Sequence, residues 1–455
     1  MAFRISSPFS WLRDALGSAA PLVFITLALL VAAYHWLEPN PPRTVRLATG
    51  PEQSAYDQFG ARYAQVLARD GIRVQLVPTE GSADNLQRLR RGEVDLAFVQ
   101  GGFARNADTA EADAQLLSLG NLFVEPVWLF YRDTARAQGN KAPSQLKHLQ
   151  GLRLNIGTPG SGVPELWTQL LALNQLDASA FATTELAPTP ATVAFINGEL
   201  DALLFASAPE APLVQMLLQT PGVHLLGFEQ SEAYARRLPF LSPALLPQGV
   251  VNLATNLPAQ DVRLVATTTS LVSREATHPA LQQLFAQAAR ELHSEASWFS
   301  RAREFPNASQ ADFELSPEAE RTLRNGPPFL QRYLPFWLAN LIERMWLVGG
   351  LIIALVLPLS RIVPPLYTLR MRSKVFRWYA ELRDIETRAQ QGEPVETLVR
   401  DLRSLTETVN AIEVPLSFAD ELYALRHNIA AVSRHVQGDT GTVTAGAATP
   451  NATAR

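Results

Sequence analysis

The 455-residue sequence contains no cysteine. This absence excludes disulfide bonds, thiol nucleophiles, thiolate metal sites and a lipid anchor on an N-terminal cysteine. It does not fix the compartment, because extracytoplasmic proteins can fold without disulfides. The formal net charge is −4, so the overall composition gives no indication of nucleic-acid binding. The chain is long enough for two or three domains.

Signatures of enzymes and metal sites are also lacking. The seven histidines are scattered, and no two of them form a close metal-binding pair. Gly157 and Gly162 have the glycine spacing of a P-loop, but Val163 and Pro164 occupy the positions of the required lysine and serine or threonine. Ser161 lacks the flanking glycines of a nucleophile elbow. We therefore expect a protein that is not an enzyme and that uses no metal or cofactor.

Two apolar segments interrupt the pattern of a soluble protein. The first, PLVFITLALLVAAYHWL at 21–37, is predicted to be a transmembrane helix or signal anchor. The alternative is a cleaved signal peptide, because Val31 and Ala33 are small residues at suitable positions. The second, MWLVGGLIIALVLPL at 345–359, is extended by aromatic residues and predicts a transmembrane helix over about 338–360, with a buried core helix as the alternative.

The charges that flank these segments predict an orientation. Arg4 and Arg13 precede the first segment, and 361–377 contains five basic residues and no acidic residue. Positively charged flanks stay in the cytoplasm. We therefore expect 1–20 and the residues after 360 to be cytoplasmic. The region 44–335 would lie outside the inner (cytoplasmic) membrane, in the periplasm or outside the cell.

Strands and helices alternate after a proline-rich spacer at 40–44. Apolar periodicity and glycine stops predict strands at 45–50, 72–79 and 94–100, and helices at 54–70 and 82–92. The same order follows with strands at 152–158, 181–186 and 200–206, and helices at 161–174 and 190–198. Gly-Glu-aliphatic-Asp precedes the last strand of both units. Two βαβαβ units are therefore expected, each with a parallel sheet.

The remaining segments predict how the two units join. A crossing strand is expected at 122–132, and the chain is expected to return through 246–253 and 262–274 before a helix at 279–294. The predicted fold class is α/β, with two lobes that enclose a cleft. Lobe 1 comprises about 44–130 and 240–335, and lobe 2 comprises about 131–239.

Three loops lead from a strand to a helix start at the predicted cleft: TGPEQSAY at 49–56, TEGSADN at 79–85 and GTPGSGVPEL at 157–166. Ligands of open α/β sheets bind beyond the carboxyl ends of the strands. Backbone N–H groups at helix starts bind carboxylate or phosphate, so an anionic solute with a carboxylate or phosphate group is expected. For Ser82 and Ser161, the alternative is that their hydroxyls only cap helices.

Four stretches resemble the TAXI family of TRAP-transporter solute receptors: VRLATGPEQSAYDQFGARYAQVL, TEGSADNLQRLRRGEVDLAFVQ, NIGTPGSG and NGELDALLFASAPEAP. Two later stretches, DVRLVATTTSLVSREATHPAL and GPPFLQRYLPFWLANLIERMW, resemble a membrane-anchored branch of that family, so the resemblance covers about 45–380. It implies a type II periplasmic-binding-protein fold that captures a small organic acid or amino acid for a TRAP-type permease.

The resemblance also implies the ligand contacts. Carried over by motif position, they are Ser54, Tyr56, Thr79, Ser82, Gln100, Gly160, Ser161, Gly162 and Ala208. The first loop departs from the family, which usually has Gly-Gly-Thr-Tyr where this chain has Gln-Ser-Ala-Tyr at 53–56.

The C-terminal region at 361–435 is predicted to be a helical tail. Apolar residues at helical spacing over 374–390, 395–409 and 418–432 favour a small bundle or self-association. Residues 436–455 have low complexity and are expected to be disordered. Two functions follow from this organisation. The first is a tethered receptor that serves a permease, and the alternative is a sensor whose ectodomain signals through the second membrane helix to the tail.

Overall fold

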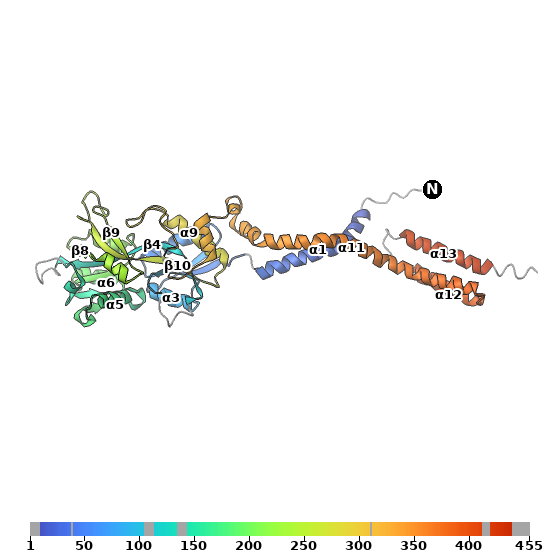
Figure 1. The fold of residues 1–455 in the computed structure, drawn as a ribbon, viewed down its shortest axis with the longest axis horizontal. Helices are drawn as coiled ribbons and strands as arrows, with labels where there is room; N and C mark the ends of the chain where they lie inside the picture. The colour runs from blue at the N-terminus through green and yellow to red at the C-terminus, as the bar shows by residue number, and fades with distance from the viewer. Residues whose placement is uncertain are drawn as a thin grey trace, which may run out of the picture. The chain divides into compact units, whose positions relative to one another are not determined.

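The computed structural model describes residues 10–37, 40–103, 113–133, 143–309, 312–411 and 419–438. The chain forms two compact units (Figure 1). One comprises Pro39–Glu343, and the other comprises Met1–Glu38 together with Arg344–Arg455.

The first βαβαβ unit is present as predicted. It consists of β1 (Thr44–Ala48), α2 (Ala55–Ala68), β2 (Arg73–Val77), α3 (Ser82–Arg90) and β3 (Leu96–Gln100). The strands are parallel in the order β2-β1-β3. Helix α2 buries Tyr56, Phe59, Tyr63 and Leu67 on one face, which is the helical periodicity that the sequence shows.

The second unit repeats this arrangement. It consists of β5 (Arg153–Asn155), α5 (Val163–Leu173), β6 (Ala182–Thr184), α6 (Pro188–Asn197) and β7 (Ala202–Ala206). Its strands are parallel in the order β7-β5-β6.

Two long strands run through both lobes. They are β4 (Leu116–Arg132) and β10 (Val262–Arg274), which pair antiparallel with each other and are called the crossing strands below (Figure 1). In lobe 1, β10 pairs antiparallel with β3, and in lobe 2, β4 pairs antiparallel with β7. Each lobe is thus three parallel strands followed by one crossing strand, and the predicted two-lobed α/β fold is confirmed.

The other elements of this unit cover or extend the sheet. The strands are β8 (Val223–Leu225), β9 (Ser242–Leu246) and β11 (Glu314–Leu315); the helices are α7 (Pro212–Gln219), α8 (Ser231–Arg237), α9 (Pro279–His293) and α10 (Pro317–Asn325). Short 3-10 turns lie at Leu146–Leu149, Pro159–Ser161, Ala178–Ala180 and Phe329–Arg332.

The chain is expected to return through 246–253 and 262–274; the second stretch matches β10, whereas only the first residue of 246–253 lies in a strand. The strand that returns to the sheet is β9, which begins four residues earlier and ends at Leu246. Pro247 follows it and lacks the N–H that would extend the ladder, and Gly249 has a positive φ of 76°. The apolar run GVVNL therefore forms a turn.

The repeated Gly-Glu-aliphatic-Asp sequence has a structural role in both lobes. Asp95 accepts hydrogen bonds from the backbone N–H and guanidinium of Arg46, which also donates to the Gly92 carbonyl. In lobe 2, Asp201 accepts the same bonds from Arg153, which donates to the Gly198 carbonyl. Each arginine lies on the first strand of its lobe, so the motif ties that strand to the end of the second helix.

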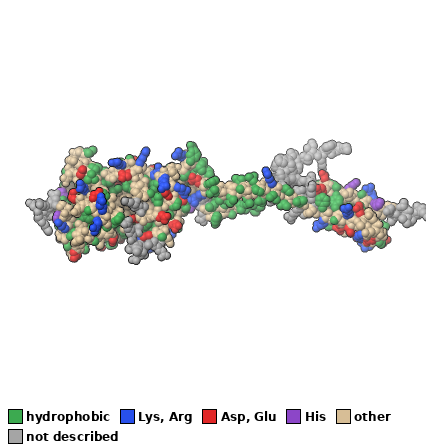
Figure 2. Space-filling model, in the orientation of Figure 1, with side chains coloured by type: hydrophobic (Ala, Val, Ile, Leu, Met, Phe, Trp, Pro, Cys, Tyr) green, Lys and Arg blue, Asp and Glu red, His purple; other side chains and the backbone are tan. Residues whose placement is uncertain are grey.

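The remaining unit is entirely helical where it is described. It contains α1 (Ser10–Leu37), α11 (Phe336–Gln390), α12 (Val395–Asn410) and α13 (Ala419–Gly438). Within the described residues, one helical segment, Phe336–Ile362, is long and apolar enough to cross a membrane, and Figure 2 shows hydrophobic side chains gathered over it. The apolar helix Val23–Leu37 is shorter than such a span, so an N-terminal anchor stays a prediction.

The tail has a hydrophobic core of its own. The end of α11 contributes Leu382 and Ile385 to it, and α12 and α13 contribute the buried residues Leu398, Leu402, Leu405, Val409, Leu422, Leu425, Ile429 and Val436. The predicted all-α tail is therefore confirmed. Residues 436–438 still belong to α13, because Val436 packs into this core, and the rest of the stretch expected to be disordered lies outside the described residues.

Candidate functional site

A cavity of about 90 Å³ lies between the two lobes. Its wall is formed by the loop from β1 to α2, the loop from β2 to α3 and the end of β3 in lobe 1, and by the loops that follow β5, β6 and β7 in lobe 2. All of these loops follow parallel strands at their carboxyl ends, where open α/β sheets bind ligands. We therefore take this cavity, called the cleft cavity below, as the candidate site.

The floor of the cleft cavity holds a buried carboxyl group. Glu125 on β4 is 2% exposed and accepts a 2.9 Å hydrogen bond from the Tyr56 hydroxyl. That hydroxyl also lies 3.0 Å from Ser82 Oγ and 3.3 Å from Thr269 Oγ1. The Ser82 hydroxyl in turn accepts from the Gln100 backbone N–H. The floor is thus a connected polar network built by α2, α3, β3 and the crossing strands.

Burial shifts the ionisation of this network. Removal from water raises the pKa of Glu125 from its usual 4.5 to about 7, against the opposing effect of hydrogen bonds from Thr269 and Tyr56. The same cause raises the pKa of Tyr56 well above its usual value, so its hydroxyl stays protonated and remains a donor. Outside the cleft cavity, burial lowers the pKa of His293 to about 3, so this imidazole is neutral.

The wall contributed by lobe 2 is mainly apolar. It is formed by Val163, Leu186, Pro188, Leu204, Phe205, Ala206, Ala211, Leu213 and Val214, with Asn155, Gly157, Ser161 and Ser207 as its other members. The cleft cavity therefore has a polar side and an apolar side, as ligand pockets commonly do.

The two lobes touch at the edge of the cleft. The Gly160 N–H donates a 3.1 Å hydrogen bond to Glu80 Oε2 across the gap. A Cβ added to Gly160 would lie 2.6 Å from Glu80 Cβ, and one added to Gly81 would lie 2.8 Å from Ser161 Cα. The contact between the lobes therefore depends on two glycines that face each other without side chains.

The chain belongs to the NMT1-like family. The model of that family matches residues 47–300, which is more than half of the chain and includes the crossing strands and every loop around the cleft cavity. No curated protein matches this sequence. The family match does not test the resemblance to TAXI receptors, which stays a prediction.

Solved structures of low sequence identity are similar to this NMT1-like protein. The alkanesulfonate-binding protein SsuA from Xanthomonas axonopodis pv. citri, bound to MOPS, is 18% identical over 64% of this chain and 86% of its own, with a TM-score of 0.35. PhnD1 from Prochlorococcus marinus with methylphosphonate is 11% identical over 56% and 83%, with a TM-score of 0.37. The GluR0 ligand-binding core from Nostoc punctiforme with L-glutamate is 13% identical over 56% and 95%, with a TM-score of 0.34.

Four of the nine predicted contact residues line the cleft cavity: Ser54, Tyr56, Gln100 and Ser161. The other five lie around it. Thr79 donates a hydrogen bond to Asn85, and Ser82 belongs to the floor network. The Gly160 N–H bonds to Glu80 of lobe 1, and Gly162 packs on Phe103. Ala208 is fully buried behind the wall. Contact of any of the nine with a solute stays a prediction.

The two serines with alternative roles differ. Ser82 does not cap α3, because Gly81 occupies the cap position and the Ser82 hydroxyl is bonded to Tyr56 and Gln100. The Ser161 hydroxyl instead donates to the Thr158 carbonyl and accepts from the Val163 N–H. The single hydroxyl proton of Ser161 is therefore donated to a carbonyl of the same turn.

Glu125 lines the cleft cavity but is not among the contact residues predicted from the sequence. It lies in the crossing strand expected at 122–132, for which the sequence predicts no further role. The signal was present, because Glu125 is the lone acid in the apolar run LFVEPVWLF. A charged residue in a buried strand needs a partner or a function.

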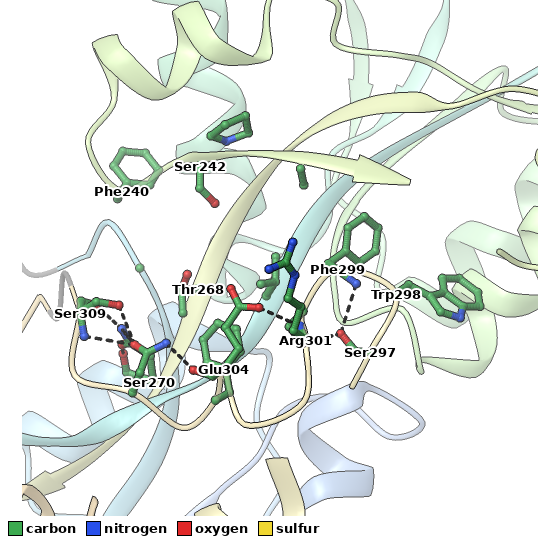
Figure 3. Close-up of a pocket in the computed structure, with 18 of the residues that line it drawn as sticks. Phe240, Ser242, Thr268, Ser270, Ser297, Trp298, Phe299, Arg301, Glu304 and Ser309 are labelled. Carbon is green, nitrogen blue, oxygen red and sulfur yellow. Dashed lines mark hydrogen bonds between the residues drawn. The ribbon is translucent and has the colours of Figure 1, made fainter. Parts of the chain in front are cut away.

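A larger cavity, of about 890 Å³, lies on the other side of the crossing strands. Figure 3 shows Thr268 and Ser270 of β10, Ser242 of β9, and Trp298, Phe299 and Arg301 of the segment after α9 around it. Thr267 and Thr269 bond to Gln100 and Tyr56 on the cleft side, so alternate residues of β10 face the two cavities. The larger cavity lies along the sides of strands, which is not where open sheets bind their ligands.

Gly160→Ala is expected to weaken solute binding about tenfold, because the added methyl group opposes contact between the lobes. Gly160 does not have a positive φ, so alanine causes no backbone strain in the separated lobes. The measurement is the affinity for a solute found by the screen described below. Gly227→Ala is the matched control, because its nearest neighbour would lie at 3.4 Å. Wild-type affinity in Gly160→Ala would contradict the role of this contact.

Glu125→Gln is expected to change how stability depends on pH. The folded state binds the Glu125 proton more tightly than the unfolded chain does, since its pKa of about 7 exceeds the usual 4.5. The free energy of unfolding therefore falls as pH rises from 4.5 to 7, by at most about 3 kcal/mol, and glutamine removes this fall.

Urea unfolding of both proteins across this pH range, followed by tryptophan fluorescence, measures the difference. The lowered pKa of His293 makes stability rise with pH between about 3 and 6.5, and this contribution is common to both proteins and cancels. Parallel pH profiles for the wild type and Glu125→Gln would show that the Glu125 proton is not bound more tightly in the folded state.

Proposed function

We propose that this protein is a membrane-tethered receptor that captures a small solute between its two lobes. The observation that supports this function most strongly is the cleft cavity, which both lobes enclose with loops at the carboxyl ends of their parallel strands. The small volume of about 90 Å³ suits a solute of few atoms. The absence of an enzyme or metal signature in the sequence agrees with capture rather than chemistry.

The connection between the lobes suits opening and closing. Among the described residues, only the crossing strands connect the lobes as regular structure, and two strands can bend without a break in the packing of either lobe. The contact between Gly160 and Glu80 would form on closure and separate on opening. A solute that binds both walls then stabilises the closed state, because it contacts both lobes only there.

The solute class that we propose is a small organic anion or an amino acid, and the recipient is a TRAP-type permease. This part rests on the resemblance to TAXI receptors. The helix starts around the cleft cavity include that of α2, where Ser54 caps the helix by accepting a hydrogen bond from the Asp57 N–H. A receptor of this kind places its binding domain in the periplasm or outside the cell.

The membrane tether is proposed from α11. Its segment Phe336–Ile362 has the length and composition of a membrane span, and the basic residues of 361–377 follow it directly. The positive flank supports a cytoplasmic tail, with the lobes on the opposite side of the inner membrane.

One observation favours the second candidate function, a sensor. Helix α11 is continuous from Phe336 to Gln390, and its last turns belong to the tail core through Leu382 and Ile385. A conformational change at the start of this helix can therefore be transmitted to the tail without passing through a flexible linker.

A thermal-shift screen of the purified chain in detergent tests the receptor function. Small carboxylic acids and amino acids are the probes, and a bound solute at a hundred times its dissociation constant adds about 2.7 kcal/mol of stability. Ser161→Trp should abolish the shift, because indole fills the cleft cavity that Ser161 lines. Ser179→Trp, at an exposed position, should retain it. A screen in which no solute of either class raises the melting temperature would overturn the function.

Copurification separates the transporter from the sensor. The full chain and a chain that ends after residue 360 are used as baits. We expect permease subunits with both baits, because the lobes and the span would make that contact. A kinase or cyclase recovered only with the full chain would instead assign the protein to signalling.

A further inference from the structure

The cleft cavity has acidic groups and no basic group on its described wall. Glu52, Glu80 and Glu125 line it, and none of the described lining residues is lysine, arginine or histidine. Glu52 and Glu80 are exposed at the mouth, whereas Glu125 is buried at the floor. A buried carboxylate ordinarily has a cationic partner in the protein. Among the described residues, the hydrogen-bond partners of Glu125 are uncharged, and the cleft cavity lies beside it.

The groups packed against Glu125 position its carboxyl group without neutralising it. Helix α2 presents Tyr56, which donates to Oε2 and stays uncharged. On β10, Thr267 is the register partner of Glu125 and Thr269 hydrogen-bonds to it. Ser82 of α3 bonds to Tyr56, and Gln100 of β3 bonds to Thr267, and both side chains are uncharged. No charged side chain contributes to the pKa shift of Glu125, which agrees with this environment.

The lobe 2 side offers little to an anion. Helices α5 and α6 begin with proline at their first or second residue, and Pro164 and Pro188 have no N–H to donate. The Val163 N–H is bonded to Ser161 Oγ already. What remains on this wall is mainly hydrocarbon, including Leu204 and Val214. A plain carboxylate would therefore meet three acids on one side and apolar groups on the other.

We propose that Glu125 determines specificity by pairing with a cationic nitrogen of the solute, whose apolar part packs against Leu204 and Val214. This inference rests on the proposed receptor function and narrows its solute class. Amino acids and amines are favoured over plain organic anions. An ammonium group supplies the positive charge and the hydrogen-bond donors that the floor network lacks.

A pH dependence follows from the pairing. Alkylammonium groups stay protonated up to about pH 10, so only the carboxylate changes its charge near neutrality. Burial places the pKa of Glu125 at about 7, and affinity for an amine should rise as pH increases through that value. The other titratable groups on the described wall are Tyr56, which stays protonated, and the exposed Glu52 and Glu80 at the mouth.

Three small probes test the proposal on the purified full chain in detergent: butylamine, 2-aminobutyrate and butyrate. Calorimetric titration should show binding of the two amine-bearing probes and no binding of butyrate. Glu125→Gln should lower the affinity for the two amine-bearing probes by about tenfold to a hundredfold. This loss corresponds to the usual strength of a hydrogen bond to a charged group. Glu232→Gln, an exposed acid on α8 away from the cavity, is the matched control and should bind as the wild type does.

Two further measurements distinguish recognition from a structural role. The affinity of Glu125→Gln for amines should no longer rise between pH 6 and 8, and Glu125→Asp should recover part of the preference for amine over carboxylate. A loss of binding without these two signatures would overturn the proposal. So would wild-type amine affinity in Glu125→Gln.

The outcome for butyrate separates this inference from the receptor function. If butyrate or another plain acid binds and the amine-bearing probes do not, the role of Glu125 is wrong and the receptor function stands. If no probe and no solute of the wider screen binds, the receptor function fails and the inference fails with it.

Discussion

The pairing of β4 with β10 is the interaction on which the rest of this structure depends. Strand β10 pairs with β3 of lobe 1 and β4 pairs with β7 of lobe 2, so the pairing of β4 with β10 fixes where the lobes meet and which loops face each other. Their side chains alternate between two surfaces, and the cleft surface receives Glu125, Thr267 and Thr269. A site at this position belongs to neither lobe alone, and its geometry changes whenever the two strands bend.

Two glycines complement the crossing strands at the edge of the cleft. Gly81 and Gly160 allow the backbones of the two lobes to approach within a distance that a methyl group would prevent. The bond from Gly160 to Glu80 adds little by itself, because Glu80 is exposed to water. In the proposed receptor, this contact would set the shape of the closed state, and its weakness would let a bound solute shift the balance between the open and closed states.

Much of the fold could be predicted from the sequence, because the repeated order of strands, helices and glycine stops is local information. The two βαβαβ units, the crossing strand β4 and the helical tail all follow from periodicity. The sequence places part of the chain's return at 246–253, whereas β9 ends at Leu246, because Pro247 lacks the N–H that would extend the ladder. Each motif aspartate bonds to an arginine that lies about fifty residues earlier in the chain. Apolar periodicity is local and cannot predict such a long-range pair.

The site was less predictable than the fold. The glycine loops pointed to the end of the strands where the cleft cavity lies, and Ser54, Tyr56, Gln100 and Ser161 line that cavity. The expectation of an anion came from helix starts considered one at a time. It could not include Glu125, which reaches the site from a strand some seventy residues after Tyr56, or the prolines that remove donors from lobe 2.

A crystal structure of the chain with the tightest-binding solute of the screen tests the central claim most directly. The account predicts electron density for the solute between Tyr56 and Glu125 on one side and Leu204 and Val214 on the other, with Gly160 in contact with Glu80. Density in the larger cavity beside Trp298 and Arg301, with the cleft cavity empty, would contradict it.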